Sequence, residues 1–239
     1  MSMIIDPARV TRLLSPEVSL RSGSGSGING KFNACVMQAV DWLAGGDGTS
    51  HAPECADGAI GSFCVRLNDS PIFGKWRDEL KPFAVRIAGT KGTDEQYAER
   101  GYIAVDFALR VAAPLAFEFW GETVKKHREA ALGFAARFRA LAPILDKDTA
   151  LAGRDLAREA QKVAAGAAYA ALRVCAEYAE DAACAAEAAC AAEAALHACA
   201  QGAYAVACVS ARSGALTRAL WDAALACLDK MICVTESEG

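Results

Sequence analysis

Hydrophobic residues recur at three- and four-residue spacing along most of the chain, a pattern that predicts helices. The first strong repeat covers residues 32–43, and Gly45-Gly46 after it favours the left-handed turn that ends a helix. Pro53 fits the first turn of a second helix, which Asn68-Asp69-Ser70-Pro71 would break. The N-terminal part is therefore expected to contain two helices separated by a glycine-rich loop.

Three further helices are expected before the chain turns alanine-rich. One covers residues 73–87. The next begins at Thr93, because Gln96 three residues later has the spacing of a capping box, and it runs towards Pro114. The third spans Glu122 to Leu141. No segment shows the β-branched alternation of a strand, so the predicted fold class is all-α, a multi-helix bundle or array.

The second half of the chain is rich in alanine. As one straight helix, residues 148–211 would be about 90 Å long, which exceeds the diameter of about 45 Å of a globule of this size. The segment is therefore expected to fold back on itself, with breaks near Gly166, Glu180, Gly202 and Gly214. The three expected parts are an N-terminal arm with a flexible Gly/Ser connector (1–28), a helical module (29–147) and a closely packed alanine-rich helical segment on that module (148–239).

Charge and composition exclude two classes of partner. The net charge is −4, and no Lys or Arg stands between positions 174 and 211, so the chain lacks the basic surface that nucleic acid requires. The longest charge-free stretch, Ala194–Ala211, is mostly alanine with several polar residues, so we expect no membrane span. Ten cysteines occur without a signal peptide, which predicts reduced thiols and a cytoplasmic protein.

One segment resembles a phosphate-binding loop. Gly25–Lys31 satisfies its first seven positions, but Phe32 stands where a Ser or Thr hydroxyl should hold magnesium. No buried strand precedes the segment. We interpret the match as chance within a Gly/Ser connector.

Cys35, His51 and Cys55 are the side chains most suited to chemistry, with Cys64 as a fourth candidate. Soft thiolates and imidazole suit zinc, and a thiol beside a histidine base suits nucleophilic catalysis. His51 and Cys55 have the spacing of neighbours on a helical turn. No Cys-x-x-Cys pair accompanies them, and Cys35 and Cys64 fall on apolar helix faces, so structural packing is the favoured interpretation.

Asp106 and Arg110 stand four residues apart on an otherwise apolar predicted helix. This spacing favours a partly buried ion pair, with an anchor for a polar ligand as the alternative.

Several short motifs resemble a group of bacterial and bacteriophage proteins that have an N-terminal helical module and an alanine-rich helical tail. The motifs are Cys35-Val36-Met37-x-Ala39-Val40, Ser50-His51-x-Pro53-x-Cys55, Asn68-Asp69, Gly89-Thr90 and Asp106…Arg110…Pro114. The resemblance implies a helical fold and a mobile-element setting, and no catalytic residues. Gln38 and Gly46 depart from the pattern because both stand where acidic residues would be expected.

The sequence thus predicts a non-enzymatic helical protein that binds or sequesters a host protein or a small ligand, without catalytic residues, cofactor or bound metal. The candidate binding residues are Cys35, Gln38, His51, Cys55, Asp106 and Arg110. Two alternatives stay open. One is a metal- or thiol-dependent enzyme that uses Cys35, His51 and Cys55. The other is a structural or self-assembling protein, including a homo-oligomer.

Overall fold

The computed structural model describes residues 5–163 and 214–234, except Ser24, Ser26, Gly30 and Val124. The helices are α1 (Pro7–Leu14), α2 (Val36–Leu43), α3 (Gly58–Asp69), the 3₁₀ helix η1 (Pro71–Leu80), α4 (Lys81–Ile87), α5 (Asp94–Asp106), the π-helical η2 (Phe107–Ala112), α6 (Ala113–Thr123), the 3₁₀ turn η3 (Lys125–His127), α7 (Arg128–Arg139), α8 (Lys147–Val163) and α11 (Gly214–Ile232). Among the described residues the only strands are β1 (Gly27–Asn29) and β2 (Lys31–Asn33), so the all-α class is confirmed.

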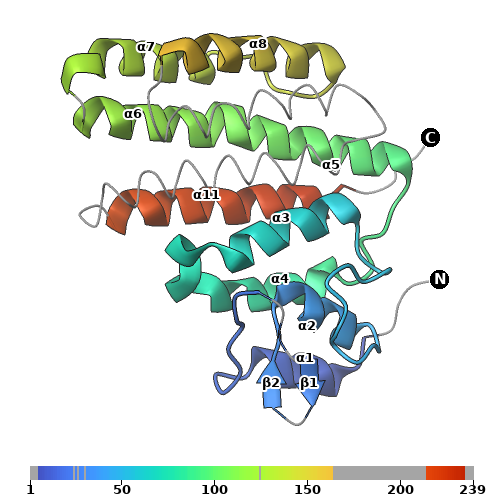
Figure 1. Cartoon of the computed structure of the whole chain (residues 1–239). Coiled ribbons are helices and arrows are strands. Elements are labelled where there is room, and N and C mark those ends of the chain that lie inside the picture. Colours follow the sequence, from blue (N-terminus) through green and yellow to red (C-terminus); the bar gives the residue numbers. More distant parts are fainter. Residues whose placement is uncertain are drawn as a thin grey trace.

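The helices lie side by side in successive layers, from α7 and α8 on one side to α1 and the β-hairpin on the other (Figure 1). The helix α11 lies between α5 and α3 and contacts both. Its side chains Trp221, Leu228 and Met231 are fully buried in a core that extends back to Leu13 in α1. The last described helix is therefore part of the central core and packs against α3 and α5 of the helical module. The expected breaks at Gly166, Glu180 and Gly202 lie outside the described residues.

Two helix starts differ from the sequence prediction. The helix α2 starts at Val36, because Phe32 pairs with Ile28 in the antiparallel hairpin. The hairpin also agrees with the interpretation of the phosphate-loop match as chance, since Lys31 begins a strand and not a helix. The helix α3 starts at Gly58 rather than at Pro53, because the Asp57 side chain accepts hydrogen bonds from the first free backbone N–H groups of the helix.

The next helix begins as predicted but ends differently. Thr93 caps α5 and forms the expected capping box with Gln96. The helix does not stop at Pro114, because the wider π-helical turn of η2 precedes it and α6 continues from Ala113. The following helix, α7, begins only at Arg128, not at Glu122.

The N-terminal arm is hydrogen-bonded to the helical module. The ammonium group of Lys81, which is 8% exposed, donates to the carbonyl oxygens of Ser15 (3.0 Å) and Val18 (2.8 Å). The carboxylate of Asp78 accepts from the backbone N–H of Leu20 at 2.7 Å. These buried bonds fix residues 15–20 beside η1 and α4.

No helix in the described ranges is long and apolar enough to cross a membrane.

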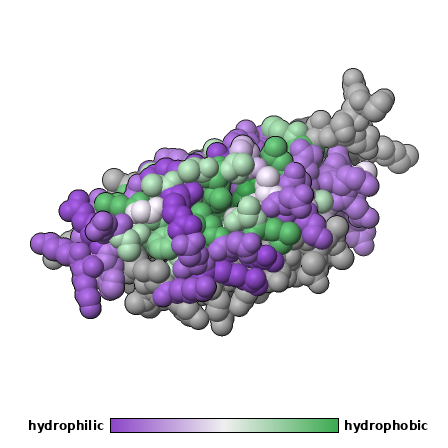
Figure 2. Space-filling model, turned by 90° about the horizontal axis from the view of Figure 1, so that it is seen from above, coloured by the Kyte–Doolittle hydropathy of each residue, from purple (hydrophilic) through white to green (hydrophobic). Residues whose placement is uncertain are grey.

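The outer layer of the molecule is amphipathic. Figure 2, which views the molecule from the side of α7 and α8, shows an apolar strip bordered by hydrophilic residues. Leu132 in α7 is 40% exposed, whereas Phe134 and Phe138 of the same helix are buried against Phe117 of α6. The helix α7 therefore contributes one face to the core and leaves some apolar surface outside.

Candidate functional site

The side chain of Gln38, in the first turn of α2, is buried. It is hydrogen-bonded to the backbone at Gly25, Cys35 and Thr49. Its amide oxygen accepts from the backbone N–H groups of Cys35 (3.1 Å) and Gly25 (2.9 Å). Its amide nitrogen donates to the carbonyl oxygens of Gly25 (3.1 Å) and Thr49 (3.5 Å). A carboxylate could make only the accepting half of this set, so glutamine suits the position better than glutamate. Gly25 is also required, because a Cβ there would lie 1.7 Å from the carbonyl oxygen of Asn33.

The structure brings Cys35 and His51 together. The sulfur of Cys35 lies 3.4 Å from Nδ1 of His51, and it also accepts from the backbone N–H of Gln38 at the start of α2. Burial raises the pKa of the Cys35 thiol, and the nearby backbone N–H groups only partly oppose this effect. Cys35 is therefore a neutral thiol in contact with an imidazole that itself is exposed.

Cys55 and Cys64 do not extend this pair into a metal site. Among the described residues, no group of three or more His, Cys, Asp or Glu side chains could hold a metal ion. The residues 51–55 form a loop rather than the helical turn that the sequence suggested. Cys55 acts through its backbone carbonyl, which accepts from the N–H groups of Gly89 (3.0 Å) and Lys91 (3.2 Å). Cys64 is fully buried in α3, and burial raises the pKa of its thiol.

A pocket of about 450 Å³ lies between α3 and the loop that precedes it. The apolar residues along its wall include the half-buried Val65 and the buried Met37 and Pro53. Gly58 and Gly61 also line the pocket, and they leave space in it because neither residue has a side chain. The volume falls within the range of about 300–1,000 Å³ that small-molecule sites occupy.

Charged and polar side chains also line the pocket. His51 and Glu54 come from the loop, Arg66 comes from α3, and Lys91 comes from the turn after α4. Of the six candidate binding residues from the sequence, only His51 lines the pocket, and Cys35 contacts the imidazole of His51. The pocket thus combines apolar residues with charged and polar side chains that could orient a ligand.

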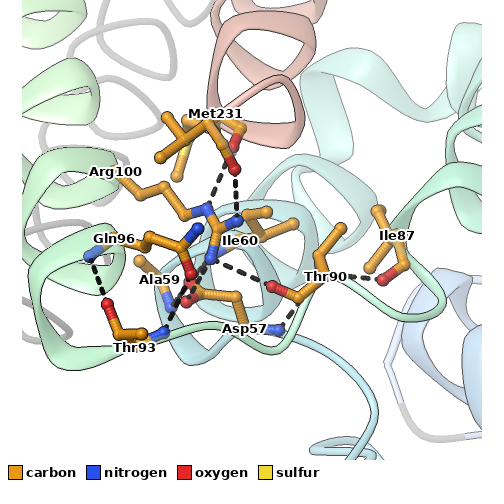
Figure 3. Close-up of polar contacts among 10 residues, drawn as sticks. Asp57, Ala59, Ile60, Ile87, Thr90, Thr93, Gln96, Arg100 and Met231 are labelled. Atoms are coloured by element: carbon orange, nitrogen blue, oxygen red, sulfur yellow. Dashed lines mark hydrogen bonds and ion pairs between the residues drawn. The ribbon is translucent and has the colours of Figure 1, made fainter. Parts of the chain in front are cut away.

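A buried ion pair holds the pocket loop in place (Figure 3). Asp57 accepts from the backbone N–H groups of Ala59 (2.9 Å) and Ile60 (3.2 Å) through one carboxylate oxygen. Its other oxygen accepts from Nη1 of Arg100 at 2.8 Å, and both side chains are 3% exposed. The carboxylate therefore caps α3 and neutralises a buried arginine at the same time.

Arg100 also connects this loop to the C-terminal end of α11. Its Nε donates to the carbonyl oxygen of Met231 (3.0 Å), its Nη2 to that of Val234 (2.9 Å) and its Nη1 to that of Thr90 (3.0 Å). Sequence reasoning missed both Arg100 and Asp57. The available signals were Asp57 just before the apolar repeat of α3, which is a helix-cap pattern, and the position of Arg100 beside the small residues Gly101 and Ala104.

Asp106 and Arg110 form the expected ion pair, at 2.9 Å, with side chains that are about a quarter exposed. The Asp106 carboxylate also accepts from the backbone N–H of Ile144 at 3.0 Å, which ties the segment before α8 to the end of α5. Neither residue lines the pocket. The ion pair therefore helps to connect the end of α5 to the segment before α8. It does not belong to the site that contains Cys35 and His51.

Comparison with protein-family models, curated proteins and solved structures finds no match for the chain. The resemblance to bacterial and bacteriophage helical proteins therefore rests on the motif residues alone. Two of these motifs, around Cys35 and around His51, meet at the edge of the pocket.

Proposed function

We propose that this is a non-enzymatic helical binding protein that holds a small ligand in the pocket between α3 and residues 51–57. The observation that supports the proposal is the pocket itself, which has a suitable volume and is lined by both apolar residues and charged or polar side chains. The loop that forms one wall is fixed by the Asp57–Arg100 pair and by the two bonds to the Cys55 carbonyl, so the pocket exists before ligand arrives. A cytoplasmic setting, expected from the cysteine usage, and sequestration of a small ligand in a host cell, suggested by the phage-like motifs, belong to the same proposal.

The pocket can be blocked by one substitution on its rim. Ala52 is exposed, lines the pocket and stands in a loop just before a proline, so Ala52→Trp should fill space without disturbing the core. Ala142 is also exposed, also in a loop and also followed by a proline, which makes Ala142→Trp the matched control. We expect small-molecule extract from the producing cells to contain a ligand that wild type and Ala142→Trp bind, and that Ala52→Trp binds at least about tenfold more weakly.

The methyl group of Met37 provides a local readout. The chain has only four methionines, and both Met37 and Met231 are fully buried, but only Met37 lies against the pocket, whereas Met231 belongs to α11 and does not line it. With ¹³C-methyl methionine, ligand binding should shift the Met37 signal and leave that of Met231 in place. If neither the extract nor a library of small metabolites moves the Met37 signal, the proposal is wrong.

A thiol-dependent enzyme is a second candidate, favoured by the contact between Cys35 and His51. In that case the proton of Cys35 would move to Nδ1 of His51, and the resulting thiolate would be stabilised by the N-terminal N–H groups of α2. The raised pKa of the buried thiol favours the binding function instead.

Alkylation distinguishes these two candidates. For a binding protein, we expect iodoacetamide at pH 7 to label Cys35 at least about tenfold more slowly than the exposed Cys233, as measured by peptide mass spectrometry. Replacement of His51 by alanine should not slow the labelling further. Faster labelling of Cys35 than of Cys233, lost in His51→Ala, would promote the enzyme to first place.

A further inference from the structure

The thiol of Cys35 is held at the start of α2. Cys35 is the N-cap residue of this helix and is 3% exposed. Its backbone N–H donates to the side-chain oxygen of Gln38 at 3.1 Å, and its sulfur accepts from the backbone N–H of Gln38. The sulfur thus already accepts a hydrogen bond from the helix, whereas its own proton still needs an acceptor, because buried polar groups are normally paired.

The acceptor for this proton is Nδ1 of His51, which lies 3.4 Å from the sulfur. In the described part of the chain, the Cys35 thiol has no second acceptor. Burial raises the pKa of the thiol, so the sulfur keeps its proton. If Nδ1–H donated to the sulfur instead, the buried thiol proton would have no partner. A neutral imidazole carries a single proton, which is therefore on Nε2 of His51.

The edge of the His51 ring that carries Nε2 is available to a ligand. His51 is exposed and lines the pocket, whereas the buried Cys35 does not line it. The two ring nitrogens point away from each other, so Nε2 lies on the side of the ring that faces away from Cys35. Among the described residues, Nε2 has no hydrogen-bond partner. The exposed part of the imidazole therefore presents an N–H donor.

The backbone before His51 is fixed as well. The carboxylate of Asp41 in α2 accepts from the backbone N–H groups of Gly48 (2.9 Å) and Ser50 (3.5 Å). Asp41 thus holds the backbone of the loop, and Cys35 holds the ring. A donor that is fixed before the ligand binds loses little conformational freedom on binding.

We infer that Cys35 is a positioning residue for His51, and that the ligand carries a hydrogen-bond acceptor, such as a carbonyl oxygen, which receives the Nε2–H of His51. This inference rests on the proposed function, because it names a polar group that the ligand of the same pocket must carry. A compound without an acceptor would take water away from the Nε2–H group and leave it unpaired, so the pocket selects against such compounds.

Nitrogen NMR of the full-length protein tests which ring nitrogen carries the proton. The chain has three histidines, and the His51 signals are identified by their loss in His51→Phe. At alkaline pH, above the range in which histidine titrates, we expect one tautomer with the proton on Nε2. Cys35→Ala should shift the ring towards the tautomer mixture of a free imidazole, and Cys35→Ser, which keeps an O–H donor, should restore the wild-type signals. A proton on Nδ1 in the wild type overturns the inference.

Two probes of nearly the same shape test the acceptor on the ligand. Acetophenone has a carbonyl oxygen where α-methylstyrene has a methylene group. The measured quantity is the ratio of their affinities, taken only for the binding that Ala52→Trp removes. We expect His51→Phe to lower this ratio by about fivefold, since the ring remains and its donor is lost. His127→Phe, at a half-buried histidine that does not line the pocket, should keep the wild-type ratio.

The variants of Cys35 connect the two measurements. Cys35→Ala should lower the affinity ratio in the same direction as His51→Phe, and Cys35→Ser should restore it. A ratio that is unchanged in His51→Phe, or binding of neither probe in the pocket, overturns the inference. The proposed function is judged separately, because it fails only if no compound of the cell extract or the metabolite library shifts the Met37 signal.

Discussion

Replacement of Arg100 by alanine is expected to lower the free energy of unfolding by about 3–5 kcal/mol, because it leaves the buried Asp57 carboxylate without its cation. The loss should exceed that of the ion pair alone. The carbonyl oxygens of Met231 and Val234 lose their donors in the same variant, and buried acceptors without partners add to the cost. Urea unfolding followed by circular dichroism measures the change.

An exposed arginine supplies the control. Arg137 in α7 pairs with Glu159 in α8, and about half of each side chain is exposed. Arg137→Ala should therefore cost less than about 1 kcal/mol. Arg100→Lys keeps the charge but cannot reproduce the planar fork that reaches three carbonyl groups, so it should fall between the two. Equal losses for Arg100→Ala and Arg137→Ala would show that the buried pair does not hold α3 and α11 together.

Replacement of Trp221 by alanine is also expected to lower the free energy of unfolding by about 3–5 kcal/mol. Trp221 is fully buried in α11, with its ring 5.1 Å from that of Phe73 and 6.4 Å from that of Trp76. Its Nε1 donates to the carboxylate of Glu79 at 2.8 Å, so the variant removes both packing and a hydrogen bond. Trp221→Phe keeps most of the packing and should lose less.

The Trp221→Ala variant also tests whether α11 belongs to the core of the N-terminal module. If it does, Trp221→Ala should lower the midpoint of a single unfolding transition that includes α3, which packs against α11. Hydrogen exchange at α3 amides should accelerate together with that at α11. Unchanged protection of α3 in the variant would mean that residues 214–234 are a separate unit.

The Arg100 contacts also matter for binding, because they position two segments that line the pocket. Arg100 fixes the turn that carries Lys91 through its bond to the Thr90 carbonyl, and it fixes Asp57 at the start of α3. The pocket is lined by residues from α3, the loop before it and the turn after α4, and Arg100 connects these to the end of α11. Ligand affinity is expected to fall in Arg100→Lys even where the protein remains folded.

The sequence by itself determined the features that depend on near neighbours along the chain. Thr93 and Gln96 are three residues apart, so their capping box forms whatever surrounds them, and Gly45 adopts the left-handed turn (φ 101°) that ends α2. The apolar period fixed the all-α class for the same reason. The pairing of Asp106 with Arg110 needed only one helical turn.

Only the tertiary structure decided what meets across long separations. Cys35 and His51 stand 16 positions apart in the sequence, and no local rule places that imidazole beside that thiol. Arg100 finds its acceptors 131 and 134 residues further along, at the end of a helix that the sequence assigned to another part of the molecule. A buried guanidinium donates hydrogen bonds to the carbonyl groups that lie next to it in the packed core. The apolar face of a helix determines that it is buried, but not which other helix covers it. The partners of Arg100, and the position of the pocket, therefore depend on how the helices pack.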